Sequence, residues 1–323
     1  MSSLKLQWID NAAIDKQRYD DCIDKCEWGK VYALSWYLDL LTNNKWELLV
    51  GGDYEVVMPV PFRKKFGIKY TYRPNFCQQL GIFSESLITL NCQIQFINEL
   101  TRVYKHINYP LNHSNLNEEF PPFRNTSFIK RTNLILNLNS DYESIYENYS
   151  GNLKKNLRKA KNAGLQIKQD IKTSEVISVY KSAWQTLHPI PDDDYNRFSN
   201  VVDHARKIGI SQNFGIFFNK KILASCVVFK YKNRIYYPFS GITKEGRNYS
   251  AIAFLIDGII SIHCNSNIYL DFEGSDIQNV KYFYQKFSPD EEHYFLINKI
   301  VPFWESFSFL DIFLKNVLHF SNK

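Results

Sequence analysis

YSGNLKKNLRKAKNAGLQI, residues 149–167, places five lysines and arginines within eight positions and then reaches a glycine and an alternating apolar run. Each residue of a helix advances about 100°, so the cations gather on one side and the apolar residues on the other. The apolar side consists of Leu153, Leu157 and Ala160. Gly164 suits the left-handed conformation that commonly ends a helix, and LQIKQDI (165–171) alternates as a strand does. The segment therefore predicts an amphipathic helix that packs on a sheet through its leucines and is followed by a strand.

The basic side of this helix has two interpretations. It is either a solvated surface, which is what a run of charges usually is, or a contact for phosphates. The chain has 39 basic and 33 acidic side chains and a net charge of +6, which permits an anionic ligand without requiring one. No aromatic side chains alternate with the cations, so general single-strand binding has weak support and no DNA partner is expected. A basic RNA-binding module stays as one alternative.

The length and composition indicate a globular protein. At 323 residues, the chain is long enough for two domains or one large one. The six cysteines form no CxxC pair and have no nearby histidine set for zinc, so we expect buried thiols in a reducing compartment and no metal site. The N-terminus lacks the apolar stretch of a signal peptide, and no window has the roughly 18 apolar residues of a membrane helix. These features predict a cytoplasmic protein without a membrane span.

The remaining patterns predict helices that alternate with antiparallel strands. In the first half, a helix at 31–41 precedes two strands that turn around Gly51-Gly52-Asp53, and an amphipathic helix follows at 87–107. The stretch 108–133 is rich in prolines and small polar residues and is expected to be a loop. The second half repeats the plan. Helices are expected at 141–163 and 174–187, in a third segment that ends near 208, and at 251–264, 276–287 and 303–319. Strands are expected at 214–219, 222–231, 234–242, 268–274 and 291–301.

This order of elements predicts an α/β (α+β) fold with two similar halves. We place the first domain at 1–139 and the second at 140–300, with the boundary just after the loop-like stretch. The apolar segment 301–323 is expected to add a final helix.

Several stretches resemble a known family. In the second half they are the opening segment (149–167), YLDFEGSD (269–276) and FYQKF (283–287). The first resembles the segment that opens the second domain of the Fem-type peptidoglycan aminoacyltransferases, and the second resembles their Tyr-Asp-Phe-x-Gly strand end. The third is similar to the Tyr-x-Lys-x-x-Phe helix of the wider GCN5-related acetyltransferase (GNAT) fold. VYALSWYLDLL (31–41) and MPVPFRKKFGIKYTYRPNFCQQLGIFS (58–84) look like strings of uncharacterised bacterial members, so the resemblance covers most of the chain.

The resemblance implies two tandem GNAT-like domains, each a mixed, mostly antiparallel central sheet flanked by helices, with 301–323 returning to pack on the first domain. It implies an acyl- or aminoacyltransferase that acts on an amine of a cell-envelope precursor or a small metabolite. The acceptor would be a small or nucleotide-linked molecule. The donor would be acyl-CoA or aminoacyl-tRNA, with no tightly bound cofactor. A degenerate, non-catalytic member that binds a ligand or a protein partner is the alternative.

Three residues are candidates for the chemistry. Acyl transfer to an amine needs a deprotonated nucleophile, a polarised carbonyl and a proton for the leaving group. By resemblance, Tyr284 matches the tyrosine that protonates the leaving group, and Tyr282 or Phe283 replaces it if the register slips. Asp271 and Glu273 are two positions apart at the end of a predicted strand, so both side chains are expected on one face, where they can orient or deprotonate the amine. The structural alternatives are an exposed tyrosine, a turn-capping aspartate and a solvated glutamate.

The expected donor-binding residues are Arg247, Tyr249 and Ser250. GNAT enzymes that use CoA show Gln/Arg-x-x-Gly-x-Gly/Ala at this place, and its backbone N–H groups hold the pyrophosphate. This chain departs from that pattern, because Ser250 and Ile252 stand at the two small positions. Side chains there limit the approach of a phosphate to the backbone, which argues against ordinary acetyl-CoA use. Ser250 is also expected to cap the following helix.

The expected substrate-binding residues are three cations and two glutamines. Under the transferase interpretation, Lys155 and Arg158 contact phosphates of tRNA or of a nucleotide-linked precursor, and Arg63 does the same from the first half. Surface charges are more often simply solvated, which is the alternative for all three. Gln78 and Gln79 are polar residues in an apolar loop, where they either line a substrate pocket or cap a neighbouring strand.

Other motifs predict no further chemistry. Asp192-Asp193-Asp194 lacks EF-hand spacing and is expected to cap a helix that starts near Tyr195. His188 precedes a Pro-Ile-Pro loop and either faces the cleft or is structural. The chain has no Walker loop, dinucleotide fingerprint or Gly-x-Ser-x-Gly motif.

Overall fold

Residues 4–115 build the first part of a sheet that continues through both halves. The computed structural model describes residues 4–115, 120–187, 189–273 and 277–300. With η marking a 3-10 helix, the elements of the first half are β1 (Leu6–Asp10), η1 (Asn11–Ala13), α1 (Lys16–Lys25), η2 (Val31–Ala33), α2 (Ser35–Thr42), β2 (Trp46–Gly51), β3 (Val56–Lys65), β4 (Ile68–Thr71), β5 (Phe83–Ser84), α3 (Leu90–Val103), β6 (Ile107–Pro110) and η3 (His113–Asn115). The predicted hairpin joins β2 to β3, which pair antiparallel.

The second half has helices on both faces of its strands. Its elements are β7 (Thr126–Asn137), α4 (Tyr142–Glu147), α5 (Gly151–Asn162), β8 (Gln166–Gln169), α6 (Thr173–Trp184), α7 (Asp192–Lys207), β9 (Ser211–Phe218), β10 (Lys221–Tyr231), β11 (Arg234–Ile242), α8 (Lys244–Asn248), α9 (Ala251–His263), β12 (Tyr269–Asp271), α10 (Gln278–Gln285) and β13 (Asp290–Lys299). Strands β9, β10 and β11 form the predicted antiparallel meander.

One sheet joins the two halves. Its order is β1-β2-β3-β4-β6-β13-β7-β12-β11-β10-β9-β8, with β5 beside β3. β13 lies between β6 and β7 and is antiparallel to both. β7, which the predicted division assigns to the first domain, pairs with β12 and β13 of the second half. The sheet therefore has no break near residue 139, and the exact domain boundary stays a prediction. The predicted tail, 301–323, lies outside the described residues.

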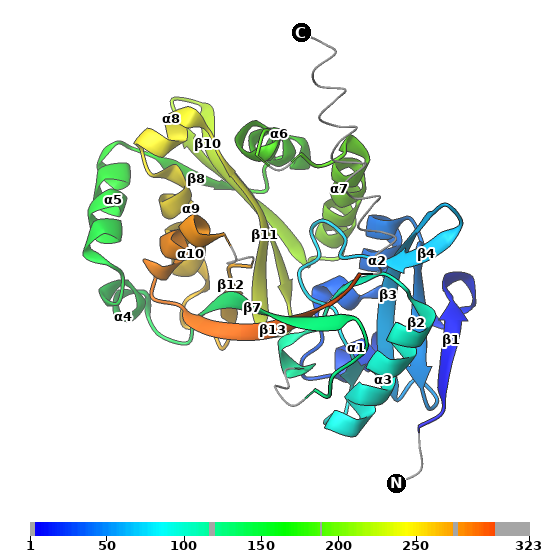
Figure 1. Ribbon diagram of the computed structural model, residues 1–323. Coiled ribbons are helices and arrows are strands. Elements are labelled where there is room, and N and C mark those ends of the chain that lie inside the picture. The colour runs from blue at the N-terminus through cyan, green and yellow to red at the C-terminus, as the bar shows by residue number, and fades with distance from the viewer. Residues whose placement is uncertain (1–3, 116–119, 188, 274–276, 301–323) are drawn as a thin grey trace.

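Two hydrophobic cores lie on opposite faces of the second half's strands. One contains side chains of α5, α9 and α10. The other contains side chains of α6 and α7 together with those of the first half, and Phe76 packs on Phe198 with ring centroids 4.4 Å apart. Figure 1 shows α6 and α7 between the meander and the first half, and α5 at the outer edge. Within the described ranges, no helix is long and apolar enough to cross a membrane.

Helix α5 confirms the interpretation of the opening segment. Ser150 caps it by accepting a hydrogen bond from the Leu153 N–H, at 3.3 Å. Leu153 and Leu157 are buried in the core that contains strand residues of β9 and β10. Gly164 ends the helix with a φ of +81°, and β8 follows. Local patterning was sufficient for the amphipathic face and for the end of this helix, because the apolar spacing and the glycine indicate the same element.

The stretch 108–133, expected to be a loop, contains part of β6 and the beginning of β7. The prediction was wrong because the first residues of β7 have no buried apolar face and so give no strand pattern. Its backbone hydrogen bonds with β13, from Thr126 opposite Lys299 to Ile135 opposite Asp290, make this stretch a strand.

Three helix ends also differ from the prediction. The helix expected at 141–163 is two helices, because Ser150 caps α5 and ends the run that begins in α4. Helix α7 starts at Asp192 instead of near Tyr195, so its three aspartates occupy the first turn, where the helix dipole stabilises negative charge. Ser250 precedes α9 with a φ of +54° and makes no side-chain cap hydrogen bond, so the predicted cap is wrong.

Candidate functional site

Strands β11 and β12 diverge in the second half's sheet. They are parallel and pair over three positions, the last of which joins Tyr236 to Asp271. β12 ends there, whereas β11 continues to Ile242 with β10 on its other side. Beyond Tyr236, one edge of β11 therefore has no strand partner within the described part of the chain.

Pro238 and Ser240 lie on this open edge. Proline cannot donate to a strand ladder, so inside sheets it occurs where the N–H side has no partner. Two residues later, the Ser240 carbonyl accepts a hydrogen bond from Trp184 Nε1 at 3.0 Å instead of one from a strand. Because the N–H and C=O of one strand residue point to the same edge, the Ser240 N–H also faces the open edge.

A pocket of about 320 Å³ opens at this divergence. Its walls come from the loop after β4, from α6 and the loop that follows it, from β11, and from the segment between β12 and α10. The lining residues are Arg73, Pro74, Asn75, Phe76, Cys77, Gln78, Tyr180, Trp184, Ile190, Tyr237, Pro238, Ser240, Phe272, Glu273, Ile277, Val280 and Tyr284. Three of the residues predicted from the sequence, Gln78, Glu273 and Tyr284, are among them. A larger cavity of about 580 Å³ between α1 and α3 contains none of them, so we consider the smaller pocket the functional candidate.

Helix α10 places Tyr284 at the pocket. Its ring stacks on Phe272 at a centroid distance of 4.7 Å, and the residue is 8% exposed. Burial raises the pKa of Tyr284 above its usual range, so the hydroxyl stays protonated at neutral pH. Tyr282, one alternative for this position, is 64% exposed, and Phe283 packs against the core around α9. The helix therefore directs Tyr284, and not its two neighbours, into the pocket lining.

Glu273 reaches the pocket because the chain turns directly after β12. The strand ends at Asp271, and Glu273 has a left-handed backbone with a φ of +49°, so the strand alternation expected for the two carboxylates does not apply. The Glu273 N–H donates to Asp271 Oδ1 at 3.1 Å, which holds the turn. Glu273 is partly exposed to the pocket, but its Oε1 is buried and has no hydrogen-bond partner among the described residues. Burial raises the pKa of Glu273 well above its usual range.

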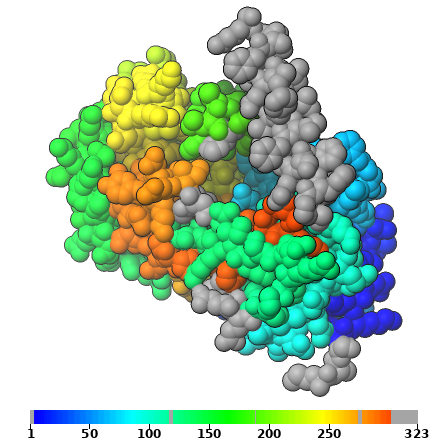
Figure 2. Space-filling model, in the orientation of Figure 1, coloured from blue at the N-terminus to red at the C-terminus, as the bar shows by residue number. Residues whose placement is uncertain are grey.

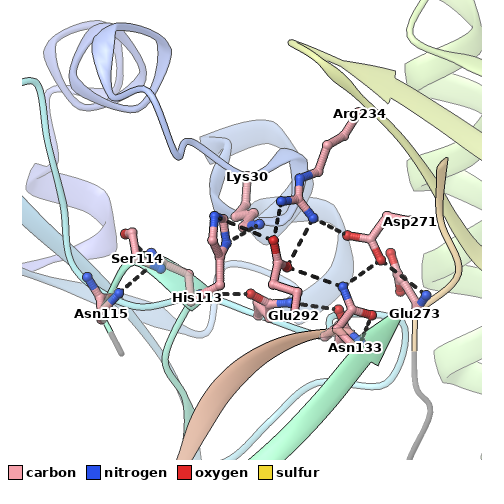
Figure 3. Close-up of polar contacts among 12 residues, drawn as sticks. Lys30, His113, Ser114, Asn115, Asn133, Arg234, Asp271, Glu273 and Glu292 are labelled. Atoms are coloured by element: carbon pink, nitrogen blue, oxygen red, sulfur yellow. Dashed lines mark hydrogen bonds and ion pairs between the residues drawn. The ribbon is translucent and has the colours of Figure 1, made fainter. Parts of the chain in front are cut away.

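A buried polar cluster adjoins Glu273 and joins the two halves (Figure 3); it consists of Lys30, Gln78, Gln79, His113, Asn133, Arg234, Asp271 and Glu292. At its centre, Arg234 Nη1 lies 2.8 Å from Asp271 Oδ2 and 3.1 Å from Glu292 Oε2, and Nη2 donates to Glu292 Oε1. Burial alone lowers the pKa of Arg234, but the two carboxylates outweigh it and hold the pKa above its usual range. The charges of Lys30 and Arg234 likewise overcome burial and lower the pKa of Glu292 to about 2. Arg234 and Glu292 are therefore both charged at neutral pH.

Lys30 and His113 complete the cluster on the side of the first half. Burial and the nearby charge of Arg234 lower the pKa of Lys30 to about 8. Lys30 Nζ lies 3.0 Å from His113 Nδ1, and a protonated lysine donates there, which leaves the ring proton on Nε2, 3.6 Å from Glu292 Oε1. Burial and the Lys30 charge lower the pKa of His113 to about 2, so its ring is neutral in the folded protein.

We expect His113 to make stability depend on pH. Its pKa is lower in the folded protein, about 2, than in the unfolded chain, about 6.5, so below pH 6.5 the unfolded state binds the additional proton. The stabilisation is complete above pH 6.5 and is lost as the pH falls. From pH 7 to pH 5, the contribution of this group falls by about 2 kcal/mol.

Urea denaturation at both pH values, with His113→Gln as the comparison, measures this contribution. The pKa values of His106 and His263 are also lowered by burial, so only the difference between the two proteins isolates His113. Equal losses of stability on acidification would contradict the assignment of a neutral His113.

The predicted phosphate-binding cations lie away from the pocket lining. Lys155 and Arg158 are exposed on α5, at the outer edge of the second half (Figures 1 and 2). Arg63, on β3, lies over the Tyr72 ring at 4.2 Å and is 3.9 Å from Asp194 of α7, so it contacts both halves. The structure therefore does not bring these three cations together.

The segment where the resemblance predicts a phosphate-binding loop, 247–252, consists of the end of α8, a turn at Tyr249 and Ser250, and the start of α9. A Cβ added at Gly246 would collide with the Leu223 carbonyl oxygen, so only glycine allows this close approach to β10. The Tyr249 ring packs on Phe218 with centroids 4.9 Å apart, and Arg247 is exposed. Arg247, Tyr249 and Ser250 thus lie at the β11–α9 connection, and none of them lines the 320 Å³ pocket.

The sequence interpretation missed several residues of the site: Lys30, His113, Asn133, Ser240, Arg234 and Glu292. Most of them come together only through long-range strand pairing, and no local pattern marks them. Pro238 was an available signal, because a proline inside a strong strand pattern indicates an edge without a partner. That edge is where the pocket lies.

The two halves share one sheet, and the second half has a helix pair before an antiparallel meander and a parallel strand pair that diverges. This arrangement is a tandem GNAT-like fold. The solved structures agree with this fold. The structure of FemX matches with a TM-score of 0.62 and 11% sequence identity, over 90% of this chain and 96% of that chain. A tandem GNAT protein from the clavulanic acid biosynthesis pathway matches with a TM-score of 0.53 and 9% identity, over 91% of this chain and 97% of that chain.

L-PGS from Bacillus licheniformis also matches, with a TM-score of 0.54 and 10% identity over 88% of this chain and 92% of that chain. No family model and no curated protein matches the sequence. At such low identities the likeness shows the fold alone. The expected tandem GNAT architecture is therefore confirmed, while the activity has to be argued from the pocket.

Proposed function

We propose that this protein transfers an acyl or aminoacyl group to an amine in the pocket where β11 and β12 diverge. The observation that carries the proposal is the lining of this pocket. It combines a backbone donor at Ser240 on the open strand edge, a protonated hydroxyl at Tyr284 and a carboxyl with raised pKa at Glu273. These are the groups that acyl transfer needs to stabilise the oxyanion, to protonate the leaving group and to accept a proton.

In the proposed reaction, the Ser240 N–H donates to the acyl carbonyl oxygen and stabilises the negative charge that develops there. The amine attacks the carbonyl carbon and loses a proton to the carboxylate of Glu273. The C–N bond forms, the bond to the leaving thiolate or alkoxide breaks, and Tyr284 gives this group its proton. Proton exchange with water then restores both side chains. The raised pKa of Glu273 makes its carboxylate a stronger base than that of an exposed glutamate.

The donor is proposed to be acyl-CoA or aminoacyl-tRNA, with no tightly bound cofactor. At the β11–α9 connection, Ser250 and Ile252 stand where the glycine-rich loop has small residues, which favours a donor that does not depend on that loop. Lys155 and Arg158 on α5, Arg247 on α8 and Tyr249 directly after it are proposed as phosphate contacts. Lys159 Nζ donates to the Asn248 carbonyl at 3.1 Å, so α5 and α8 form adjacent surfaces.

The acceptor is proposed to be an amine of a cell-envelope precursor or a small metabolite. A pocket of about 320 Å³ holds a small molecule or one end of a larger, nucleotide-linked one. The same departure from the glycine pattern at Ser250 and Ile252 favours a second candidate, a non-catalytic protein that binds a ligand in this pocket. The two candidates differ in whether a product forms.

The test has two steps. The melting temperature is measured with acetyl-CoA, an aminoacyl-tRNA mixture and a UDP-linked muramyl peptide, because a bound ligand stabilises the folded state by mass action. Ser240→Trp, which fills the pocket, is the control and should abolish any shift. Mass spectrometry then follows acylation of a mixture of amines. A donor-dependent product supports the transferase; a shift without product supports the binding protein; no shift with either donor contradicts the transferase.

A further inference from the structure

A chain of hydrogen bonds runs from the first half to Glu273 (Figure 3). Gln78 Nε2 donates to Asn133 Oδ1 at 3.1 Å, and Asn133 Nδ2 donates to Asp271 Oδ1 at 2.9 Å. The same Asp271 oxygen accepts the Glu273 N–H at 3.1 Å. Gln78 belongs to the loop after β4 in the first half, whereas Asp271 and Glu273 belong to the end of β12 in the second. Both ends of this chain, Gln78 and Glu273, line the pocket.

The direction of these bonds is fixed at both ends. At one end, the backbone N–H of His113 donates to Gln79 Oε1 at 3.1 Å, so Gln79 Nε2 is free to donate to Gln78 Oε1, at 3.0 Å. At the other end, the Asp271 carboxylate can only accept. Three amides between one obligatory donor and one obligatory acceptor can point in only one way. We call Gln79, Gln78 and Asn133 the amide relay.

The amide relay is shielded from water. Gln79 is 1% exposed, Gln78 6%, and Asn133 and Asp271 are both fully buried. Water therefore cannot replace a lost partner easily, and removing one amide leaves a buried polar group without its hydrogen bond. Arg234 Nη1 donates to Asp271 Oδ2 at 2.8 Å. The other oxygen, Oδ1, accepts hydrogen bonds from Asn133 and from the Glu273 N–H, so both oxygens of this carboxylate are held in place.

We propose that Gln78 is a positioning residue for Glu273: through Asn133 and Asp271, it holds the left-handed turn that directs the Glu273 carboxyl into the pocket. A residue of the first half thereby fixes the position of a carboxyl group that the second half contributes to the pocket. Nothing in the reaction requires Gln78 to touch the substrate. A role for Gln78 in catalysis rests on the proposed function, in which Glu273 is the base. The structural dependence of Glu273 on Gln78 does not rest on it.

The side-chain carboxyl of Glu273 reports on this coupling directly. In the full chain labelled with ¹³C at glutamate carboxyls, an NMR titration measures its pKa, with Glu273→Gln identifying the signal. Gln78→Met preserves the size of the side chain and removes the hydrogen bond to Asn133. We expect the variant to release the turn, to let water reach the carboxyl and to lower the pKa of Glu273 toward the usual range of an exposed glutamate.

Asn75→Ala is the matched control, because Asn75 lines the same pocket from the same loop but bonds to Asp194 at 2.6 Å instead of to the relay. It should leave the Glu273 titration unchanged. Gln78→Glu provides a second variant: its carboxyl keeps the acceptor for Gln79 and can donate to Asn133 only while protonated. This variant should show the wild-type Glu273 signal at low pH and lose it as the introduced carboxyl ionises.

A Glu273 titration that is unchanged in both Gln78 variants would overturn the proposal. An equal shift in Asn75→Ala would also do so, since it would show a general effect of the loop. If Gln78→Met does not fold, the test is whether Gln78→Glu shows the wild-type Glu273 signal at low pH and loses it as the introduced carboxyl ionises. The result is independent of acyl transfer, so a protein with the coupling but without a product would refute the proposed activity and leave the positioning role intact.

Discussion

Replacing Arg234 with methionine is expected to lower the free energy of unfolding by about 3–5 kcal/mol. The change leaves Asp271 and Glu292 as neighbouring carboxylates in the interior without the guanidinium that binds both, and only the more distant charge of Lys30 remains to compensate them. Arg234 is only 7% exposed and supplies hydrogen bonds to both. Urea denaturation at pH 7 measures the loss.

Arg63→Met is the matched control for this experiment. Arg63 also connects the two halves, but its side chain is 43% exposed and lies 3.9 Å from Asp194, so its loss should cost less than about 1 kcal/mol. Similar losses for Arg63 and Arg234 would contradict the central role of Arg234 in the polar cluster. Stability of Arg234→Met should recover at low pH relative to the wild type, because protonation neutralises the two unpaired carboxylates.

Replacing Tyr284 with phenylalanine is expected to lower the turnover number of acyl transfer by about 100- to 10,000-fold. The substitution preserves the ring that stacks on Phe272 and removes only the hydroxyl, so folding and the KM for the donor should change little. Initial rates with the donor and amine found in the acylation screen measure the effect.

Tyr282→Phe is the control on the same helix. Tyr282 is 64% exposed, whereas Tyr284 is buried at the pocket, so removal of the Tyr282 hydroxyl should leave the rate unchanged. If Tyr284→Phe retains more than half of the wild-type rate, Tyr284 is not the acid. In the wild type, the raised pKa of Tyr284 predicts no loss of rate through this group up to about pH 10.

The parts of the fold that follow from short segments were predictable from the sequence. The amphipathic character of helix α5 and the turn at Gly164 depend on neighbouring residues, and so does the β2–β3 hairpin. The position of Tyr284 on α10 also follows from helical spacing combined with the family resemblance. These features need no knowledge of what the segment packs against.

The polar cluster was not predictable in this way. Glu292 lies directly opposite Asn133 only because β13 pairs with β7, and the two residues are 159 positions apart. Glu273 was expected to follow strand alternation, but a positive φ beyond the end of β12 redirects it. A glutamate with a left-handed backbone is uncommon, and here the hydrogen bond from the Glu273 N–H to Asp271 holds it. No sequence pattern indicates this contact.

The insertion of β13 between β6 and β7 limits how the molecule can move and how it can be divided. Because β13 is hydrogen-bonded to β6 and to β7, a hinge motion that separates the two halves would have to break one of these two strand pairings. A fragment that ends before Asp290 lacks β13 and leaves one edge of β6 and one edge of β7 without a partner. Unpaired strand edges can pair with other chains, so we expect excised halves to aggregate.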